Sequence, residues 1–242
     1  MLKTPKFKLK NSKPEQDFIE WNKSMSHHFD QDNYYYKSHP FIVWVENLRL
    51  KAISKIIKSH IDINKNTNPM ILEVGCGAGH VLEEIVNSIP EVVLTGLDPL
   101  QEWLDKAKKR LGNKSVKLIN GLGENLPFED KSMDCTICTE VLEHVLDPKA
   151  ILKELSRVTK HNGLVVVSIP NEVLINRLKN LIDAFKIYEK LFPNIQKHND
   201  WHIHCFDIES FKEIIPEGLK IKSIYSIPFL LLPLRYVITF KV

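Results

Sequence analysis

This chain of 242 residues has only four cysteines, a net charge of only +3 and no extended apolar segment. No apolar run reaches the ~20 residues that a membrane-spanning helix needs, and the Lys-rich residues 1–10 lack the apolar core of a signal peptide. Lys and Arg number 33 against 30 Asp and Glu, so the net charge of +3 does not suggest a nucleic-acid partner. We therefore expect a cytoplasmic protein that binds no nucleic acid.

The four cysteines are too few for a disulfide scaffold, which agrees with a reducing compartment. Cys135 and Cys138 form a C-x-x-C pattern, but residues 133–139 have the composition of a strand. Positions i and i+3 of a strand face opposite sides of a sheet. This pair of thiols therefore predicts no metal site.

Short apolar runs alternate with amphipathic stretches from residue 70 to about 168, which predicts a parallel sheet covered by helices. We expect strands at 70–74, 92–97, 116–119, 133–139 and 164–169, and helices at 78–89, 100–111 and 149–160, the last ending at His161-Asn162-Gly163. Beyond residue 170 we expect a long amphipathic helix at 172–192, a His-rich loop at 198–204, a helix opened by Asp207, and strands near 219–227 and 236–240. The first 60 residues are expected to be helical, most strongly at 41–57.

A glycine-rich string, Glu73-Val74-Gly75-Cys76-Gly77-Ala78-Gly79, stands where the first strand passes into the first helix. Glycines there allow positive φ and let a ligand approach the backbone closely. A dinucleotide fingerprint G-x-G-x-x-G needs glycine at position 80, where the chain has His80, so NAD is the weaker candidate. Asp98 ends the second strand, a position from which a carboxylate can accept hydrogen bonds from both ribose hydroxyls of an adenosine. An adenosine-containing ligand is therefore indicated.

The chain resembles the class I S-adenosylmethionine-dependent methyltransferases in six segments that follow in the family's order, at 71–79, 96–98, 126–128, 133–134, 140–145 and 163–167. Residues 140–148, Glu-Val-Leu-Glu-His-Val-Leu-Asp-Pro, are most similar to the branch that contains ubiquinone-biosynthesis O-methyltransferases. The resemblance implies a doubly wound α/β fold with a seven-stranded, mostly parallel, Rossmann-like sheet. It also implies a helical N-terminal extension and lid at 1–60, and a methyltransferase domain at 61–242 with a helical cap insertion at 171–205 after the fifth strand.

The same resemblance implies S-adenosylmethionine as the cofactor. Glu73 would receive the cationic amino group of its methionine moiety, and Asp98 would bind its ribose. Leu122 departs from the family, which often has an acid there to accept from the adenine amino group, and the loss weakens binding by roughly 0.5–1.5 kcal/mol. The implied cofactor site is Glu73, Gly75, Cys76, Gly77, Gly79, Asp98, Pro99, Leu122, Gly123, Glu124 and Thr139.

A hydroxyl acceptor needs a base, and His144 is the nearest titratable candidate on the matched motif; the alternative is a structural histidine that shapes the pocket. His202 and His204 lie in the His-rich loop, for which three alternatives stay open. They line the acceptor pocket, they bind a metal with Asp200 or His144, or they belong to a solvent-facing polar loop. We name His144, His202 and His204 as the candidate catalytic residues and assign no metal.

Two further segments bear on the acceptor. Tyr34, Tyr35 and Tyr36 are candidates for an aromatic lid, with packing of an accessory helix as the alternative. The apolar residues 227–234 contain two prolines, which predict a surface connection rather than a central strand. This connection either contacts a bilayer or a lipid-like acceptor, or packs against helix 172–192.

These features predict an enzyme that transfers a methyl group from S-adenosylmethionine to a small molecule, preferentially at oxygen. The alternative is a cofactor-binding interaction module without catalysis.

Overall fold

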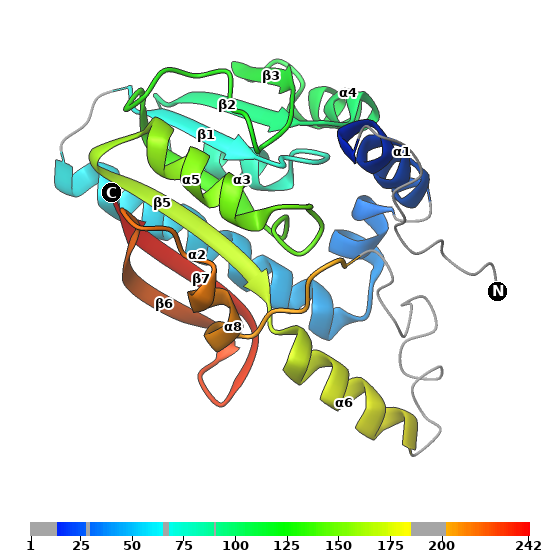
Figure 1. The fold of residues 1–242 in the computed structure, drawn as a ribbon. Helices are drawn as coiled ribbons and strands as arrows, with labels where there is room; N and C mark the ends of the chain where they lie inside the picture. Colours follow the sequence, from blue (N-terminus) through cyan, green and yellow to red (C-terminus); the bar gives the residue numbers. More distant parts are fainter. Residues whose placement is uncertain (1–13, 28–29, 65–67, 90, 185–201) are drawn as a thin grey trace.

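Seven strands form one mixed sheet through the centre of the protein (Figure 1). The computed structural model describes residues 14–27, 30–64, 68–89, 91–184 and 202–242. The strand order is β3-β2-β1-β4-β5-β7-β6, and β7 alone runs against its neighbours. The strands are β1 Met70–Val74, β2 Val93–Asp98, β3 Val116–Asn120, β4 Met133–Thr139, β5 Thr159–Pro170, β6 Lys220–Phe229 and β7 Leu232–Lys241. The chain order reverses between β1 and β4, which is where doubly wound sheets bind ligands at the carboxyl ends of the strands.

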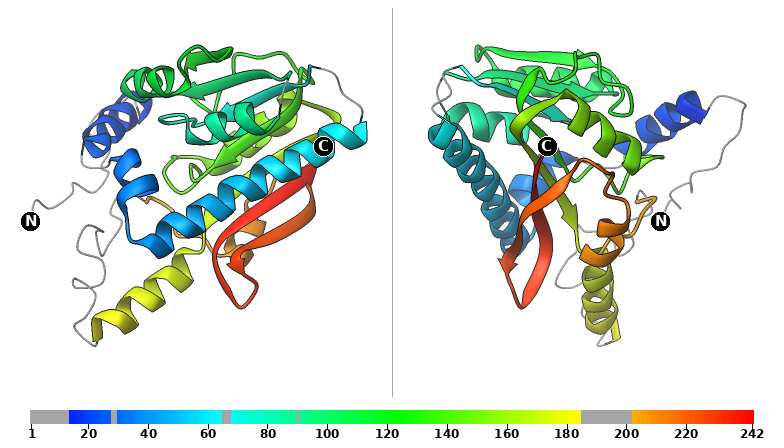
Figure 2. Two further views of the ribbon diagram at one scale, coloured as in Figure 1. Left: turned by 180° about the vertical axis from the view of Figure 1, so that it is seen from behind. Right: turned by 60° about the vertical axis from the view of Figure 1, so that its left-hand side comes forward.

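Helices cover both faces of the sheet (Figures 1 and 2). Side chains of α2, α3 and α4 enter one hydrophobic cluster, and those of α1, α5 and α8 enter another. The long α2 crosses one face of the sheet, as the left-hand view of Figure 2 shows, and α6 projects away from the body. The helical elements are α1 Pro14–Ser26, the π-helix η1 Asn33–Lys37, α2 Pro40–Asn64, α3 His80–Ser88, α4 Gln101–Leu111, α5 Pro148–Val158, α6 Glu172–Ala184 and α8 Ile208–Glu213. The doubly wound fold with a helical N-terminal part is thereby confirmed.

The C-x-x-C pattern lies in a strand, as predicted. Cys135 and Cys138 are both fully buried, and each belongs to a different hydrophobic cluster, so they face opposite sides of β4. The two thiols therefore act as small core side chains.

The junction between α5 and β5 differs from the prediction. Asp147 caps α5 by accepting from the backbone N–H of Ala150, but the helix ends at Val158 and not at His161-Asn162-Gly163. Thr159 is already the first residue of β5, where it pairs with Met133 of β4. Its hydroxyl donates to the carbonyl of Leu155 at 2.6 Å. The register between β4 and β5 shifts in this region, so the glycine that resembled a helix stop belongs to an irregular strand.

The prediction that 227–234 is a connection between strands is also wrong. Pro228 lies in β6 and Pro233 in β7, opposite each other near the tip of a β-hairpin. The prolines are tolerated because β6 is an edge strand and because the pairing of β7 with β5 ends at Arg235. At the tip, Leu230 is 82% exposed and Leu231 is 96% exposed.

Two predicted boundaries, the division after residue 60 and the end of helix 172–192, can be compared with the observed helices. The division between 1–60 and 61–242 falls inside α2, which is continuous and whose buried side chains share one hydrophobic cluster with those of the sheet. The predicted helix 172–192 is present as α6 up to Ala184, and its remainder lies outside the described residues, as do His198 and Asp200. In the described part of the chain, no helix has the length and hydropathy required to cross a bilayer.

Candidate active site

The turn between β1 and α3 brings backbone N–H groups to the carboxyl edge of the sheet. Gly75 and Cys76 both donate to the carbonyl of Leu97 in β2, at 2.7 and 3.0 Å. Gly75 has a φ of 73°, and a Cβ there would lie 2.3 Å from Val141 Cγ2. Only glycine satisfies both the conformation and the space.

Asp98 holds the turn from the end of β2. Its two carboxylate oxygens accept the backbone N–H groups of Gly77 and Leu100, each at 2.9 Å. Burial raises the pKa of Asp98 to about 6, against the lowering effect of these two donors. A carboxylate offers about four lone-pair sites, so capacity remains for the hydroxyls of a ribose.

Glu73 has the features expected of a side chain that binds a cationic ligand. Its side chain is 1% exposed, and its Oε2 has no hydrogen-bond partner among the described residues. Burial raises the pKa of Glu73 well above its ordinary value; the positive charge of Arg49 opposes this shift, and the negative charge of Asp98 adds to it. The amino group of a methionine moiety would supply both the missing hydrogen bond and the missing charge.

Residues 30–37 lie over the glycine turn. Gln31 accepts the backbone N–H of Ala78 at 2.9 Å, and the ring of Tyr35 stacks on His80 with centroids 4.0 Å apart. Arg110 of α4 donates to the hydroxyl of Tyr36 at 2.9 Å. The segment, which we call the lid, is therefore tied to the glycine turn by hydrogen bonds and by ring stacking.

A buried ionic network joins the lid to the sheet. Arg49 pairs with Glu46 at 2.8 Å within α2, and Arg235 of β7 pairs with Glu140 at 2.8 Å. Tyr34 connects the two pairs, because its hydroxyl donates to Glu46 at 3.1 Å and accepts from Arg235 at 2.8 Å. These charges are compensated within the network, as buried charges need to be.

Sequence reasoning missed this network, although the sequence carries a signal for it. Arg49 occupies the same helix face as Val45 and Ile53, four residues away on either side, and both are buried. An arginine in the apolar stripe of an amphipathic helix needs a buried partner.

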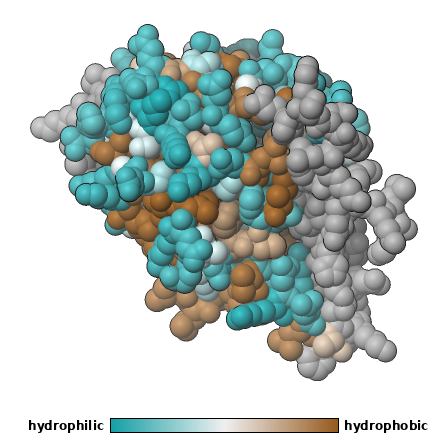
Figure 3. Space-filling model, in the orientation of Figure 1, coloured by the Kyte–Doolittle hydropathy of each residue, from teal (hydrophilic) through white to brown (hydrophobic). Residues whose placement is uncertain are grey.

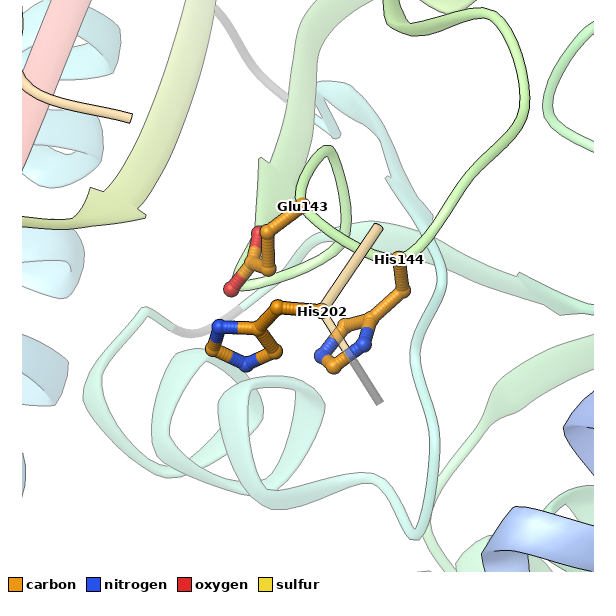
Figure 4. A group of neighbouring side chains, drawn as sticks. All are labelled: Glu143, His144 and His202. Carbon is orange, nitrogen blue, oxygen red and sulfur yellow. The ribbon is translucent and has the colours of Figure 1, made fainter. Parts of the chain in front are cut away.

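Glu143, His144 and His202 converge at the other end of the cavity (Figure 4). One ligand-type atom of each residue lies within 4.8 Å of those of the other two. The two imidazole rings meet edge to face, with centroids 4.6 Å apart and an interplanar angle of 80°. Glu143 is 1% exposed, its Oε2 has no hydrogen-bond partner among the described residues, and burial raises its pKa well above the ordinary value, with the charge of Glu140 adding to the shift.

Backbone hydrogen bonds bring His202 to this place. The carbonyl oxygen of Glu143 accepts the N–H of Ile203 at 2.7 Å and that of His204 at 3.1 Å. The imidazole Nδ1 of His202 lies 2.9 Å from Oε1 of Glu172, the first residue of α6. The loop before α8 is therefore docked on the turn after β4.

One cavity of about 890 Å³ unites these groups. Among the residues predicted for the cofactor, ten line it: Glu73, Gly75, Cys76, Gly77, Asp98, Pro99, Leu122, Gly123, Glu124 and Thr139. His144 and His202 line it as well, together with Tyr34 and Tyr35 of the lid. Leu122 thus stands at the cavity wall in the position where the family often has an acid.

Two predicted site residues lie elsewhere. Gly79 is the N-cap of α3 with a φ of 82°, and a Cβ there would lie 3.1 Å from Ala107 Cβ, so the glycine permits close packing of α4. The imidazole Nε2 of His204 is 2.9 Å from the carbonyl oxygen of Val145, and its ring stacks on Phe206 at 5.7 Å. The structure therefore separates His204 from His202, which faces the cavity.

Comparison with known proteins agrees with this geometry. Residues 72–167 match the family described as a methyltransferase domain. An uncharacterized methyltransferase of Schizosaccharomyces pombe is 40% identical over 106 residues, which are 39% of this chain and 37% of that protein. Demethylmenaquinone methyltransferase of Staphylococcus epidermidis is 31% identical over 160 residues, or 62% of this chain and 65% of that protein. The chain therefore spans between about a third and two thirds of the length of these relatives.

Solved structures share the fold at low identity. The PH0226 protein from Pyrococcus horikoshii superposes with a TM-score of 0.62 and 16% identity, covering 90% of this chain and 98% of that chain. The N-methyltransferase NodS from Bradyrhizobium japonicum gives a TM-score of 0.57 and 13% identity, covering 81% of this chain and 96% of that chain.

Residues 72–167 match a methyltransferase domain, and the strand order and the paired acids at the glycine turn agree with that match. The residues present fit S-adenosylmethionine as the cofactor of this domain. Glu73 offers an unpaired buried carboxylate for the amino group, and Asp98 offers acceptor sites for the ribose.

Proposed function

We propose that this protein transfers the methyl group of S-adenosylmethionine to an oxygen atom of a small molecule with an apolar body. One observation carries the proposal: a single cavity of about 890 Å³ is lined at one end by Glu73 and Asp98 and at the other by Glu143, His144 and His202. Its volume lies near the upper end of the ~300–1,000 Å³ typical of ligand pockets. Such a cavity has space for an acceptor beside the cofactor.

The cofactor supplies an activated methyl group, so the chain has to position the acceptor and manage one proton. Positioning alone can contribute ~7–11 kcal/mol to lowering the barrier. A neutral hydroxyl must lose its proton as the new bond forms, and the cluster of Glu143, His144 and His202 lies at the acceptor end of the cavity, where it can promote that loss. A purely binding module would not need such a cluster in its cavity.

Apolar side chains form much of the wall on the acceptor side. Ile42 and Val45 come from α2, Ile175 and Leu178 from α6, and Leu234 from β7. These residues favour an acceptor with a hydrophobic ring or chain. The name of the Staphylococcus epidermidis relative gives demethylmenaquinone as its substrate, which supports a quinone-like acceptor here.

An exposed apolar surface continues from the cavity to the hairpin tip. Phe41 lines the cavity, and the centroid of its ring lies 5.7 Å from that of Trp44. The ring centroid of Trp44 lies in turn 5.7 Å from that of Phe229. The tip residues Leu230 and Leu231 are strongly exposed. In Figure 3 the hairpin projects at the lower left, where its surface is brown and therefore hydrophobic. We propose that this tip contacts a bilayer, from which a lipid-like acceptor would reach the cavity along an apolar path.

The proposal is tested by incubating the protein with methyl-labelled cofactor and a cell extract that includes the lipid fraction. The expected product is a labelled small molecule whose methyl group is bound to oxygen, as identified by mass spectrometry and NMR. A labelled N-methyl or C-methyl product would contradict the choice of oxygen. Binding of S-adenosylhomocysteine without any labelled product would favour the interaction module instead.

A further inference from the structure

We propose that Glu143, His144 and His202 bind a divalent transition-metal ion of the Zn²⁺ type at the acceptor end of the cavity. The role of the ion in catalysis rests on the proposed function, but its binding does not. Side chains of the three residues point toward one another from two separate loops (Figure 4).

The donor set matches that class of ion. Two imidazoles and one carboxylate are a common set for catalytic Zn²⁺ and for related divalent ions, and they leave at least one position open. The three donor atoms already lie within 4.8 Å of one another. Ligation at about 2.1 Å places donor atoms about 3.4 Å apart, so a side-chain shift of about 1 Å completes the site.

Glu143 gives a second and independent indication. It is 1% exposed and its Oε2 has no hydrogen-bond partner among the described residues, and Figure 4 shows its carboxylate beside the ring of His202. An unsatisfied buried carboxylate oxygen is costly, and a bound cation would remove that cost.

His202 has the support that metal-binding histidines usually have. Its Nδ1 lies 2.9 Å from Oε1 of Glu172, an ion-pair contact that leaves Nε2 as the nitrogen available to a metal. The hydrogen bonds from Ile203 and His204 to the carbonyl of Glu143 hold the loop itself in place. The ligand, its orienting carboxylate and its backbone anchor are therefore all present.

The surrounding charges are compatible with a dication. Arg235 lies near Glu143, but its guanidinium is paired with Glu140 at 2.8 Å and lies 3.3 Å from Glu46. Lys179 lies near Glu172 on α6. The cavity as a whole is lined by eight acidic side chains, Glu46, Glu140, Glu143 and Glu172 among them, and by four basic ones, Lys37, Arg49, Lys179 and Arg235.

The open position would take the acceptor oxygen. Coordination lowers the pKa of a bound hydroxyl, so its proton leaves to solvent water and the oxygen remains as an alkoxide or phenolate. A lone pair of that oxygen forms the new C–O bond while the C–S bond breaks and leaves its electron pair on sulfur. The products are a methyl ether, S-adenosylhomocysteine and one proton.

Cobalt is the probe, because Co²⁺ occupies Zn²⁺ sites and absorbs visible light. The full chain is stripped with a chelator and titrated with Co²⁺, and the bound metal is counted by elemental analysis. We expect one Co²⁺ per chain, and weakening by more than about 100-fold in Glu143→Gln and His202→Gln. Glu172→Gln should weaken binding by about 10–100-fold, as loss of an orienting carboxylate does.

His161→Gln is the matched control, because it removes an exposed imidazole on β5. It should bind Co²⁺ like the unmodified protein, and every variant should keep its affinity for S-adenosylhomocysteine within about threefold if it is folded. Absence of saturable binding, or equal binding by Glu143→Gln and His202→Gln, overturns the site. If Co²⁺ binds but no extract yields a methylated product, the proposed function fails and the metal site stands. If a methylated product forms without saturable Co²⁺ binding, the metal site fails and the proposed function stands.

Discussion

The backbone N–H of Ile203 donates to the carbonyl oxygen of Glu143 at 2.7 Å. This bond joins the loop before α8 to the turn after β4 and brings His202 against His144. The acceptor end of the cavity is therefore assembled from two segments that are distant in the sequence, whereas most of the cofactor end comes from the successive loops that follow β1 and β2.

Asp98 should make cofactor binding depend on pH. Its pKa of about 6 reflects burial, and ribose hydroxyls that donate to the carboxylate would lower it in the complex. Affinity for S-adenosylhomocysteine should therefore rise as the pH increases through 6, and then level off with respect to this group. Asp98→Asn should remove that rise and weaken binding by about 10–100-fold at pH 8.

Glu73 also titrates in the site, and its pKa responds to the charge of Asp98. The calorimetric comparison of the unmodified protein with Asp98→Asn is therefore repeated in a Glu73→Gln background. A ratio of affinities that stays flat between pH 5 and 8 in both backgrounds would remove Asp98 from the ribose site.

Glu73 should release a proton when the cofactor binds. Burial raises its pKa well above the ordinary value in the empty site, and a cationic amino group bound beside it favours the carboxylate and lowers the pKa again, so binding drives proton release. Calorimetry at pH 7 in buffers of different ionisation enthalpy should show up to one proton released per S-adenosylhomocysteine. Glu73→Gln should abolish this release, and an unchanged buffer dependence would contradict the assignment.

Arg110 should hold the lid closed. Its Nε donates to the carbonyl of Ala78 at 2.8 Å, its Nη1 donates to Tyr36, and its guanidinium forms an ion pair with Asp32. Arg110→Ala should weaken cofactor binding about tenfold and speed hydrogen exchange in residues 30–37, because several charge-assisted bonds are lost together.

The neighbouring Lys109, exposed on the same helix, is the matched control for that experiment. Lys109→Ala should leave both measurements unchanged. Equal effects of the two substitutions would mean that general surface charge on α4, and not the lid contact, influences the cofactor.

The hairpin tip should determine membrane contact. Replacing Leu230 and Leu231 together by serine removes two exposed leucines, each of which would gain ~1.5–3 kcal/mol if fully buried in a bilayer. Co-sedimentation with phospholipid vesicles should fall at least tenfold, while the melting temperature stays the same. Leu181→Ser on α6, where the leucine is 59% exposed, is the matched control and should retain vesicle binding.

The sequence predicted the central sheet well because its strands are short, buried and separated by amphipathic helices. It failed at 227–234, since the rule that excludes proline applies to central strands, and β6 is an edge strand. It also failed at Thr159, where pairing with Met133 overrides a local helix-stop signal. Both errors concern tertiary context that a single segment does not contain.

The same distinction holds for the site. Glu73 and Asp98 were predictable because a glycine turn and a strand end place them locally. The partnership of His202 with Glu143 depends on backbone bonds between distant loops, and the ionic network of Arg49 and Arg235 depends on how α2 and β7 meet. His204 appeared equivalent to His202 in the sequence, yet its ring is bound to the carbonyl of Val145.

The role of the acceptor-end cluster is tested most directly by measuring turnover and cofactor affinity side by side in Glu143→Gln, His144→Ala and His202→Gln. With the acceptor identified from extract, we predict that each substitution lowers turnover by ~10²–10⁴-fold, because each removes a group that acts on the acceptor proton. Affinity for S-adenosylhomocysteine should stay within about threefold of the unmodified protein, since Glu73 and Asp98 remain. Full activity in all three variants, or a loss of cofactor affinity that matches the loss of turnover, would contradict the assignment of this cluster to the methyl acceptor.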